Sequence, residues 1–487
     1  MLLAGVVMVT GAVAASIASR TRVPILVVFL ALGMALGSEG PGGIDFDDPD
    51  LARSVGVLGL VAILFEGGLT TAWSDIRGLL VPTVVLATAG VTLTAGVVGL
   101  VAFAVFDVPI EVALLLGAVV GSTDAAAVFS TLRSTNLKRR VASLLEAESG
   151  ANDPMAVALT IGLIEFILEP AYGLRDMLLL LAGQLGMGLT VGLVLGAVAF
   201  RAFERAPGGL VPFAPALSLG AAAVSFGAAD VLGGSGFLSV YVVGLFIGNC
   251  AVPFQRTMRE FHGGLAVLSQ VMLFVALGLL VFPSRLLPIA LPGLVVAAAL
   301  LFVARPFAVW ICTVRQGFPF NERVLLGWAG LRGAVPIVLA TFALSSEVVE
   351  SNTIFNGVFF VVIVSALVQG PTLEPLARRL GLSVETRPFY VPPLKVADIH
   401  GADLVEYVVH DEEVVAGVTV ADLGVREVAT VTVIVREEQS VLPDETTVLL
   451  PGDRIYMLVR SKHLAKVERT LKKRREASPD RTGDDAS

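Results

Sequence analysis

Residues 146 to 160 read EAESGANDPMAVALT and lie between apolar runs long enough to cross a bilayer. An ionised Asp or Glu at membrane depth is costly, so such residues usually face a wet cavity or an ion path and have a partner. Ser149, Asn152 and Asp153 can project from nearby parts of one helical face, and Pro154 removes an amide hydrogen beside Asp153. The stretch predicts an ion site within a membrane span. The alternative is a polar helix end in a loop, since basic residues lie slightly upstream.

The composition supports the membrane interpretation. The chain has 487 residues, of which 55% are hydrophobic and 16% charged, with a mean hydropathy of +0.84. These values predict an all-α polytopic membrane protein. The net charge of -8 argues against a nucleic-acid partner, and Cys250 and Cys312 suggest neither a disulfide framework nor a zinc site.

The charge distribution divides the chain. Lys138 is the only lysine before residue 395, so a charged part follows the apolar one. We expect four regions, which are listed here: a transmembrane domain over residues 1–380, a linker over 381–400, a small cytoplasmic α+β domain over 401–474 and a disordered tail over 475–487.

Apolar windows of about 20 residues predict thirteen spans. They are Leu2 to Ala18, Val23 to Gly37, Leu51 to Thr70, Leu80 to Phe106, Ile110 to Leu132, Val141 to Leu168, Met177 to Phe200, Leu210 to Leu232, Gly236 to Ala251, Gly264 to Phe282, Leu286 to Trp310, Val324 to Leu344 and Thr353 to Leu373. Positive residues gather in alternate loops, so the positive-inside rule predicts a cytoplasmic carboxyl terminus and an external amino terminus.

Two predicted spans are interrupted in corresponding places. The fifth carries Gly121-Ser122-Thr123-Asp124, and the twelfth carries Gly330-Leu331-Arg332-Gly333 followed by Pro336. Broken helices seven spans apart enter from opposite sides, which predicts inverted repeats around a midplane binding site. Glycines that merely permit close helix packing are the alternative, but they leave a mid-span Asp124 and Arg332 unexplained.

Broken helices offer ligands for an ion. Unwound backbone frees carbonyls and leaves half-helix ends whose partial charges Asp124 and Arg332 would compensate. Thr123 could add an oxygen to a cation shell, since hard cations prefer oxygen donors. Glu66 is a further carboxylate in the apolar part, and its alternative is a side chain that snorkels from a span end.

These motifs resemble one family. GSTDAAAV at 121, EAESGANDPMAVAL at 146, FEGGL at 65, GSGFLSVYVVGLFIGN at 234 and GLRGAVPIVLA at 330 are similar to the NhaP-type branch of the cation:proton antiporters. The resemblance implies thirteen helices with two crossed broken ones in an NhaA-like fold, a homodimer in the bacterial cell membrane, and exchange of Na+ or K+ against H+. No enzymatic activity and no cofactor are implied.

The resemblance also implies roles for single residues. Asp153 would take either the cation or the proton, and its neighbour Asn152 gives the Asn-Asp pair of the electroneutral branch. The residues that would complete or support the cation shell are Ser149, Thr123, Asp124 and Glu66. Glu148 and Arg332 would form a buried ion pair. Gly150-Ala151 departs from the bulkier apolar residues that are usual between the Ser and the Asn, and the extra backbone freedom there leaves the radius of the site, and hence the choice of ion, open.

Physical chemistry supports the same activity. Desolvation disfavours the charged form of a carboxylate in a partly dry cavity, so a proton and a cation compete for one negative charge. If only a loaded site crosses the membrane, this competition becomes exchange. Two other classes are a cation channel gated by the cytoplasmic domain, which lacks a repeated carbonyl filter here, and a sensor that no longer transports.

The cytoplasmic region has its own pattern. Short alternating strands are predicted over Leu404 to Val409, Ala429 to Arg436 and Arg454 to Val459, with a turn at Pro451-Gly452-Asp453 and a basic amphipathic helix beyond Ser461. The region resembles the TrkA-C (RCK C-terminal) domain. The resemblance implies regulation by a ligand, for instance the nucleotide cyclic di-AMP; the alternative is a docking or dimerising domain without ligand.

Overall fold

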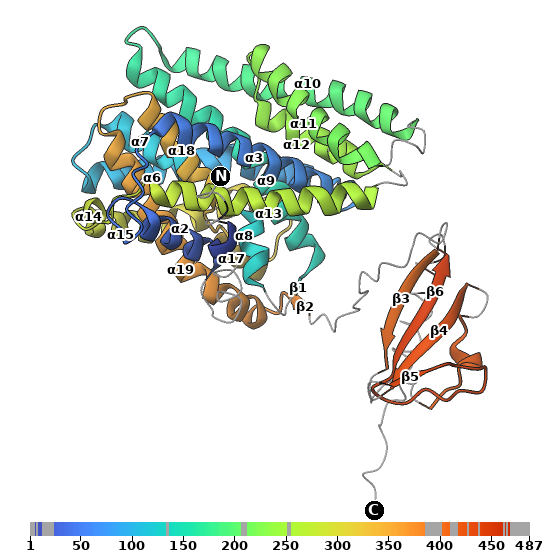
Figure 1. The fold of residues 1–487 in the computed structure, drawn as a ribbon. Coiled ribbons are helices and arrows are strands. Elements are labelled where there is room, and N and C mark those ends of the chain that lie inside the picture. The colour runs from blue at the N-terminus through green and yellow to red at the C-terminus, as the bar shows by residue number, and fades with distance from the viewer. Residues whose placement is uncertain are drawn as a thin grey trace, which may run out of the picture. The chain divides into compact units, whose positions relative to one another are not determined.

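The computed structural model describes the two parts of the chain separately. It describes residues 5, 8–11, 24–132, 136–205, 212–250, 255–384, 402–409, 417–425, 428–436, 439–460, 463 and 466–467. Contacts divide the chain into two compact units, Met1–Val384 and Glu385–Ser487 (Figure 1). The predicted linker is described only over residues 381–384. The predicted tail lies outside the described residues, as does most of the predicted basic helix.

The first unit is helical. Its helices are α2 (Ile25–Leu36), α3 (Pro49–Thr70), α4 (Trp73–Ile76), α5 (Leu80–Val85), η1 (Leu86–Gly90), α6 (Val91–Val105), α7 (Ile110–Val119), α8 (Ala125–Thr131), α9 (Arg139–Leu168), α10 (Leu174–Glu204), α11 (Ala214–Val231), α12 (Gly236–Gly248), α13 (Gln255–Leu279), α14 (Pro283–Leu286), α15 (Ala290–Ala299), η3 (Leu300–Ala304), α16 (Arg305–Thr313), α17 (Phe320–Trp328), α18 (Ala334–Ser345) and α19 (Ser351–Arg379). A two-residue strand pair, β1 (Asn136–Leu137) with β2 (Ser383–Val384), ties the end of the unit to the start of α9.

Eight helical segments in the described part of the chain are long and apolar enough to cross a membrane. Four further apolar helices, α2, α7, α12 and α18, are shorter. The predicted spans from the second to the thirteenth each overlap helices, whereas the first falls mostly outside the described residues. The protein is therefore a multi-pass helical membrane protein, and the number thirteen stays a prediction.

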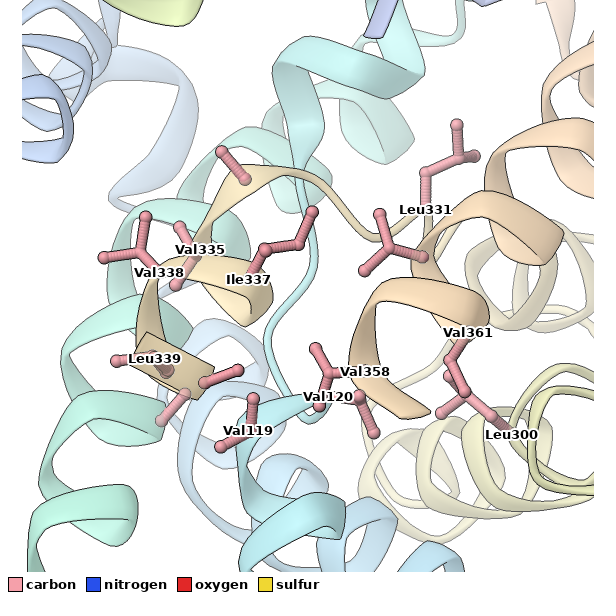
Figure 2. Packing of buried hydrophobic residues seen from close by; sticks show 14 of the residues in the cluster. Val119, Val120, Leu300, Leu331, Val335, Ile337, Val338, Leu339, Val358 and Val361 are labelled. Atoms are coloured by element: carbon pink, nitrogen blue, oxygen red, sulfur yellow. The ribbon is translucent and has the colours of Figure 1, made fainter. Parts of the chain in front are cut away.

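Both predicted interruptions are confirmed. The fifth predicted span is divided between α7 and α8 by residues 120–124, and the twelfth between α17 and α18 by residues 329–333. Figure 2 shows the buried apolar side chains around these breaks, including Val119 and Val120 at the end of α7 and Ile337 and Leu339 on α18. The two interrupted helices thus lie inside an otherwise close-packed apolar core.

Glycines allow the helices around the site to approach closely. At Gly68 of α3, a Cβ atom would lie 2.3 Å from the Tyr241 carbonyl oxygen of α12. At Gly244 and Gly248 of α12, it would lie 2.6 Å and 2.2 Å from carbonyl oxygens of α3. Small residues at such positions let membrane helices pack backbone against backbone. The relative position of α3 and α12 is therefore fixed.

The second unit contains a four-stranded antiparallel sheet in the order β3-β6-β4-β5. Its strands are β3 (Ala402–Val408), β4 (Ala429–Arg436), β5 (Gln439–Val441) and β6 (Arg454–Arg460), with a short helix η4 (Ala421–Leu423). The three predicted strands are confirmed, and Gly452 takes the predicted turn with φ +87°. Apolar side chains form the core, among them Ile434, Ile455 and Met457.

Candidate functional site

A cavity of about 230 Å³ lies inside the helical unit, beside both breaks. Four carboxylates line it: Glu66 from α3, Asp124 from the first break, and Glu146 and Asp153 from α9. Ser149, Gly150, Tyr241 and Gln270 are also in its wall. Predicted site residues from three separate parts of the sequence thus meet at one cavity.

The periodicity of α9 explains which of its side chains face the cavity. Glu146, Ser149, Gly150 and Asp153 follow the spacing i, i+3, i+4, i+7 of one helical face, and all four line the wall. Asn152 lies off this face, where its Nδ2 donates to Thr123 Oγ1 at 2.6 Å. Asp153 and Ser149 are therefore in the wall as predicted, whereas Asn152 and Thr123 bond to each other behind it.

Asp153 is buried without full hydrogen bonding. Its side chain is 6% exposed, and Oδ1 has no hydrogen-bond partner among the described residues. Burying a carboxylate oxygen without a donor is expensive, so a proton, a cation or water is needed there. Asp124 faces the same cavity, and two like charges at one site oppose each other's ionisation. The arrangement favours one positive charge, a proton or a cation, bound between the two carboxylates.

Asp124 connects the first break to the second. Its backbone N–H donates to the Leu331 carbonyl at 2.8 Å, and its Oδ1 accepts from the Ala127 N–H at 3.0 Å, which caps α8. The next N–H, that of Ala125, donates to Ser149 Oγ at 3.2 Å. A Cβ atom at Gly333 would lie 1.8 Å from Asp124 Oδ2, so only glycine fits beside this carboxylate.

The predicted ion pair between Glu148 and Arg332 is wrong in its basic partner. Arg305, at the start of α16, donates from Nη1 and Nη2 to the Glu148 carboxylate oxygens at 2.5 and 2.8 Å, and both side chains are buried. Arg332 instead donates from Nη1 to the carbonyls of Gly121, at 2.9 Å, and Ser122. Carbonyls freed by a broken helix need donors, and a guanidinium supplies several.

Sequence reasoning missed three residues of this region. Arg305 lies inside a predicted span, in LFVARPFAVW at 301, and a basic residue at that depth was a signal for a buried partner. Glu146 had a signal too, because it precedes Ser149 by one helical turn. For Gln270 of α13, the sequence contains no signal that places it at the cavity. His262, just before the predicted span that begins at Gly264, is also buried: it is 1% exposed within α13, with Nε2 2.7 Å from Ser218 Oγ.

The carboxylates surround the cavity without converging on one point. Among the described residues, no three His, Cys, Asp or Glu side chains lie close enough to hold a metal ion together. A small cation at Asp153 would therefore take its other oxygens from hydroxyls, carbonyls and water.

Comparison with known proteins identifies the family. Residues 5–379 match the model of the sodium/hydrogen exchanger transmembrane family, and residues 404–472 match the TrkA-C domain. The chain is 42% identical over 397 residues to a K(+)/H(+) antiporter NhaP of Alkalimonas amylolytica, covering 81% of this chain and 69% of that protein. It is 37% identical over 455 residues to a K(+)/H(+) antiporter NhaP2 of Shewanella sp. (strain ANA-3), covering 92% and 79%.

A solved structure agrees with the sequence comparison. The sodium proton antiporter MjNhaP1 from Methanocaldococcus jannaschii, at pH 8, superposes with a TM-score of 0.67 at 26% identity, over 78% of this chain and 97% of that one. The fold and the sequence therefore agree, and the chain belongs to the sodium/hydrogen exchanger family and carries a TrkA-C domain at its carboxyl end.

Proposed function

We propose that this chain exchanges a monovalent cation for H+ across a membrane, with Asp153 as the carboxylate that binds either ion. The observation that carries the proposal is the buried Oδ1 of Asp153, which has no hydrogen-bond partner in the part of the chain that the structure describes and lies in a cavity shared with Asp124. A proton or a cation can satisfy that oxygen, but not both at once. Exchange follows if the cavity opens to the two faces of the membrane only when one of them is bound.

We propose K+ as the transported cation. The two relatives at 42% and 37% identity are named K(+)/H(+) antiporters, whereas the sodium proton antiporter of known structure is 26% identical. Ser149, Asp124 and water would supply further oxygens to the ion, and Glu66 and Glu146 would attract cations to the cavity. Na+ stays the second candidate.

The exchange is proposed to be electroneutral, with one cation for one proton. Asn152 stands beside Asp153, and its amide donates to Thr123. A neutral amide cannot carry a second proton at this position. The charge on Asp153 is then balanced in both loaded states.

Replacement of Asp153 by Asn tests the assignment. In proteoliposomes that hold a pH gradient, K+ or Na+ should dissipate the gradient with the wild-type chain and not with Asp153→Asn, because the substitution keeps the shape and removes the charge. Asp230→Asn is a matched control, since Asp230 is exposed on α11 and does not line the cavity. Exchange retained by Asp153→Asn contradicts the assignment.

We also propose the finer architecture implied by the resemblance: thirteen helices in inverted repeats, a homodimer in the bacterial inner membrane, an external amino terminus and a cytoplasmic TrkA-C domain. The two broken helices support the repeats, and the alternate positive loops support the orientation. Regulation would act through the TrkA-C domain, with cyclic di-AMP as the ligand to test first. Titration of that nucleotide against the exchange rate checks this.

A further inference from the structure

Tyr241 separates two cavities of opposite character. Besides the ion cavity, it lines a second cavity of about 960 Å³, whose wall is largely apolar and includes Leu189, Leu193 and Phe246. No other residue in the described part of the chain lines both. The Tyr241 side chain is 7% exposed. Its ring therefore forms the partition between a cavity with four carboxylates and an apolar crevice.

The backbone that carries Tyr241 is fixed by glycine contacts. Its own carbonyl oxygen meets α3 at Gly68, where a Cβ atom would come within 2.3 Å. The ring lies on Gly150 of α9, since a Cβ atom there would be 2.2 Å from Cε2 and 2.4 Å from Cζ. Gly150 precedes Asp153 by three residues, about one helical turn. The ring is thus held close to the carboxylate that the proposed exchange uses.

This contact shows that Gly150 has a different structural role from the one expected. The sequence suggested extra backbone freedom at Gly150, but the residue is helical and makes room for a ring. An aromatic ring on a glycine therefore replaces the bulkier residue that is usual at this position. The radius of the site depends on Tyr241, which comes from another helix.

The oxygen of the Tyr241 hydroxyl is buried, and no described residue donates a hydrogen bond to it. Thr71 lies beside it, and the Thr71 hydroxyl donates to the Gly67 carbonyl at 2.6 Å, so Thr71 Oγ1 can accept the phenol proton but gives none in return. A buried hydroxyl in a polar cavity is normally satisfied by water or by a ligand. A phenol oxygen can accept from water on a hydrated cation or contact the cation itself.

We propose that Tyr241 is a specificity-determining residue of the exchange, whose hydroxyl gives an oxygen to the cation or its remaining water while its ring closes the ion cavity toward the apolar crevice. This inference rests on the proposed function. It assigns the hydroxyl to affinity and the ring to closure. Ring and hydroxyl can be changed separately, so the two parts can be tested apart.

Tyr241→Phe removes the hydroxyl and keeps the ring. We expect the apparent KM for K+ or Na+ in proteoliposomes to rise about three- to tenfold, the loss of one hydrogen bond, with the maximal rate within about twofold of wild type. Tyr172→Phe is the matched control, because the Tyr172 hydroxyl oxygen is also buried with no hydrogen-bond partner among the described residues but lines neither cavity. It should leave both parameters unchanged.

Gly150→Ala tests the seat of the ring. The added methyl group cannot fit beside the ring, so the ring must move and we expect kcat/KM to fall at least tenfold. Adding Tyr241→Leu to Gly150→Ala removes the clash, which should restore folding. Because the ring and the hydroxyl are then both absent, we expect a KM at least as high as in Tyr241→Phe and a maximal rate below that of Tyr241→Phe. This double variant keeps the test informative even if Gly150→Ala fails to fold.

The outcomes separate this inference from the proposed function. If wild type exchanges and Asp153→Asn does not, but Tyr241→Phe keeps the wild-type KM for both cations, the role of Tyr241 is overturned. If the double variant regains the wild-type KM, the role proposed for the Tyr241 hydroxyl in cation affinity is also overturned. A wild-type chain that exchanges neither cation overturns instead the proposed function.

Discussion

The buried pair of Glu148 and Arg305 makes the sharpest prediction for the stability of the helical unit. Arg305→Met removes the guanidinium but keeps most of the volume of the side chain. The Glu148 side chain is fully buried and Arg305 is 3% exposed, and the two Nη–O contacts are 2.5 and 2.8 Å. Removing one partner of such a pair leaves a buried charge alone and costs about 3–5 kcal/mol.

The assay is thermal unfolding of the purified full chain in detergent. For a unit of this size, the loss corresponds to a fall of about 4–6 °C in melting temperature for Arg305→Met. The double variant Glu148→Leu with Arg305→Met removes both charges and should recover most of the loss, because the cost comes from the unpaired charge. Arg139→Met is a control at a surface pair with Asp75, in which the Arg139 side chain is 77% exposed, and we expect it to melt close to wild type.

The reasoning is refuted if Arg305→Met melts within about 1 °C of wild type. It is also refuted if the double variant is no more stable than the single one, since the defect would then come from lost packing. A rescue that appears only with both substitutions assigns the cost to the charge on Glu148.

Three further predictions follow from other contacts. Arg332→Ala should lower the yield of folded protein in detergent, because two carbonyls of the first break lose their donor; a wild-type melting temperature contradicts this. The exchange rate should not change when a potential is clamped across the vesicle, since Asn152 is neutral and net charge movement would be worth about 2.3 kcal/mol per 100 mV; a several-fold change refutes it. In the TrkA-C domain, burial raises the pKa of Asp453, but hydrogen bonds from Arg436 and from the backbone lower it more, so the net pKa is below its usual value. This carboxylate therefore stabilises the domain above pH about 4 and loses that contribution as pH falls through the lowered pKa, and Arg436→Gln should remove most of this dependence in hydrogen exchange of the sheet.

Sequence predicted the elements of this site better than their contacts. The breaks were predictable because glycine together with a charged residue interrupts an apolar run, Gly121 with Asp124 in the first and Gly330 and Gly333 with Arg332 in the second. The face of α9 was predictable in part, since helical spacing puts Ser149 and Asp153 together. The partner of Glu148 was not, because Arg305 and Arg332 are both buried basic residues and only their tertiary positions decide which of them reaches Glu148. The contact of Tyr241 with Gly150 was hidden for the same reason.

The close approach of Gly333 to Asp124 also limits how this protein can be made more robust. Replacing a helical glycine by alanine commonly stabilises a protein by reducing the freedom of the unfolded chain. At residue 333, a methyl group would collide with the carboxylate oxygen of Asp124. Gly183 and Gly186 of α10 have nothing within 4 Å of an added Cβ atom. A thermostable variant for biophysical work should therefore be sought on α10, while the glycines of the two breaks are left as they are.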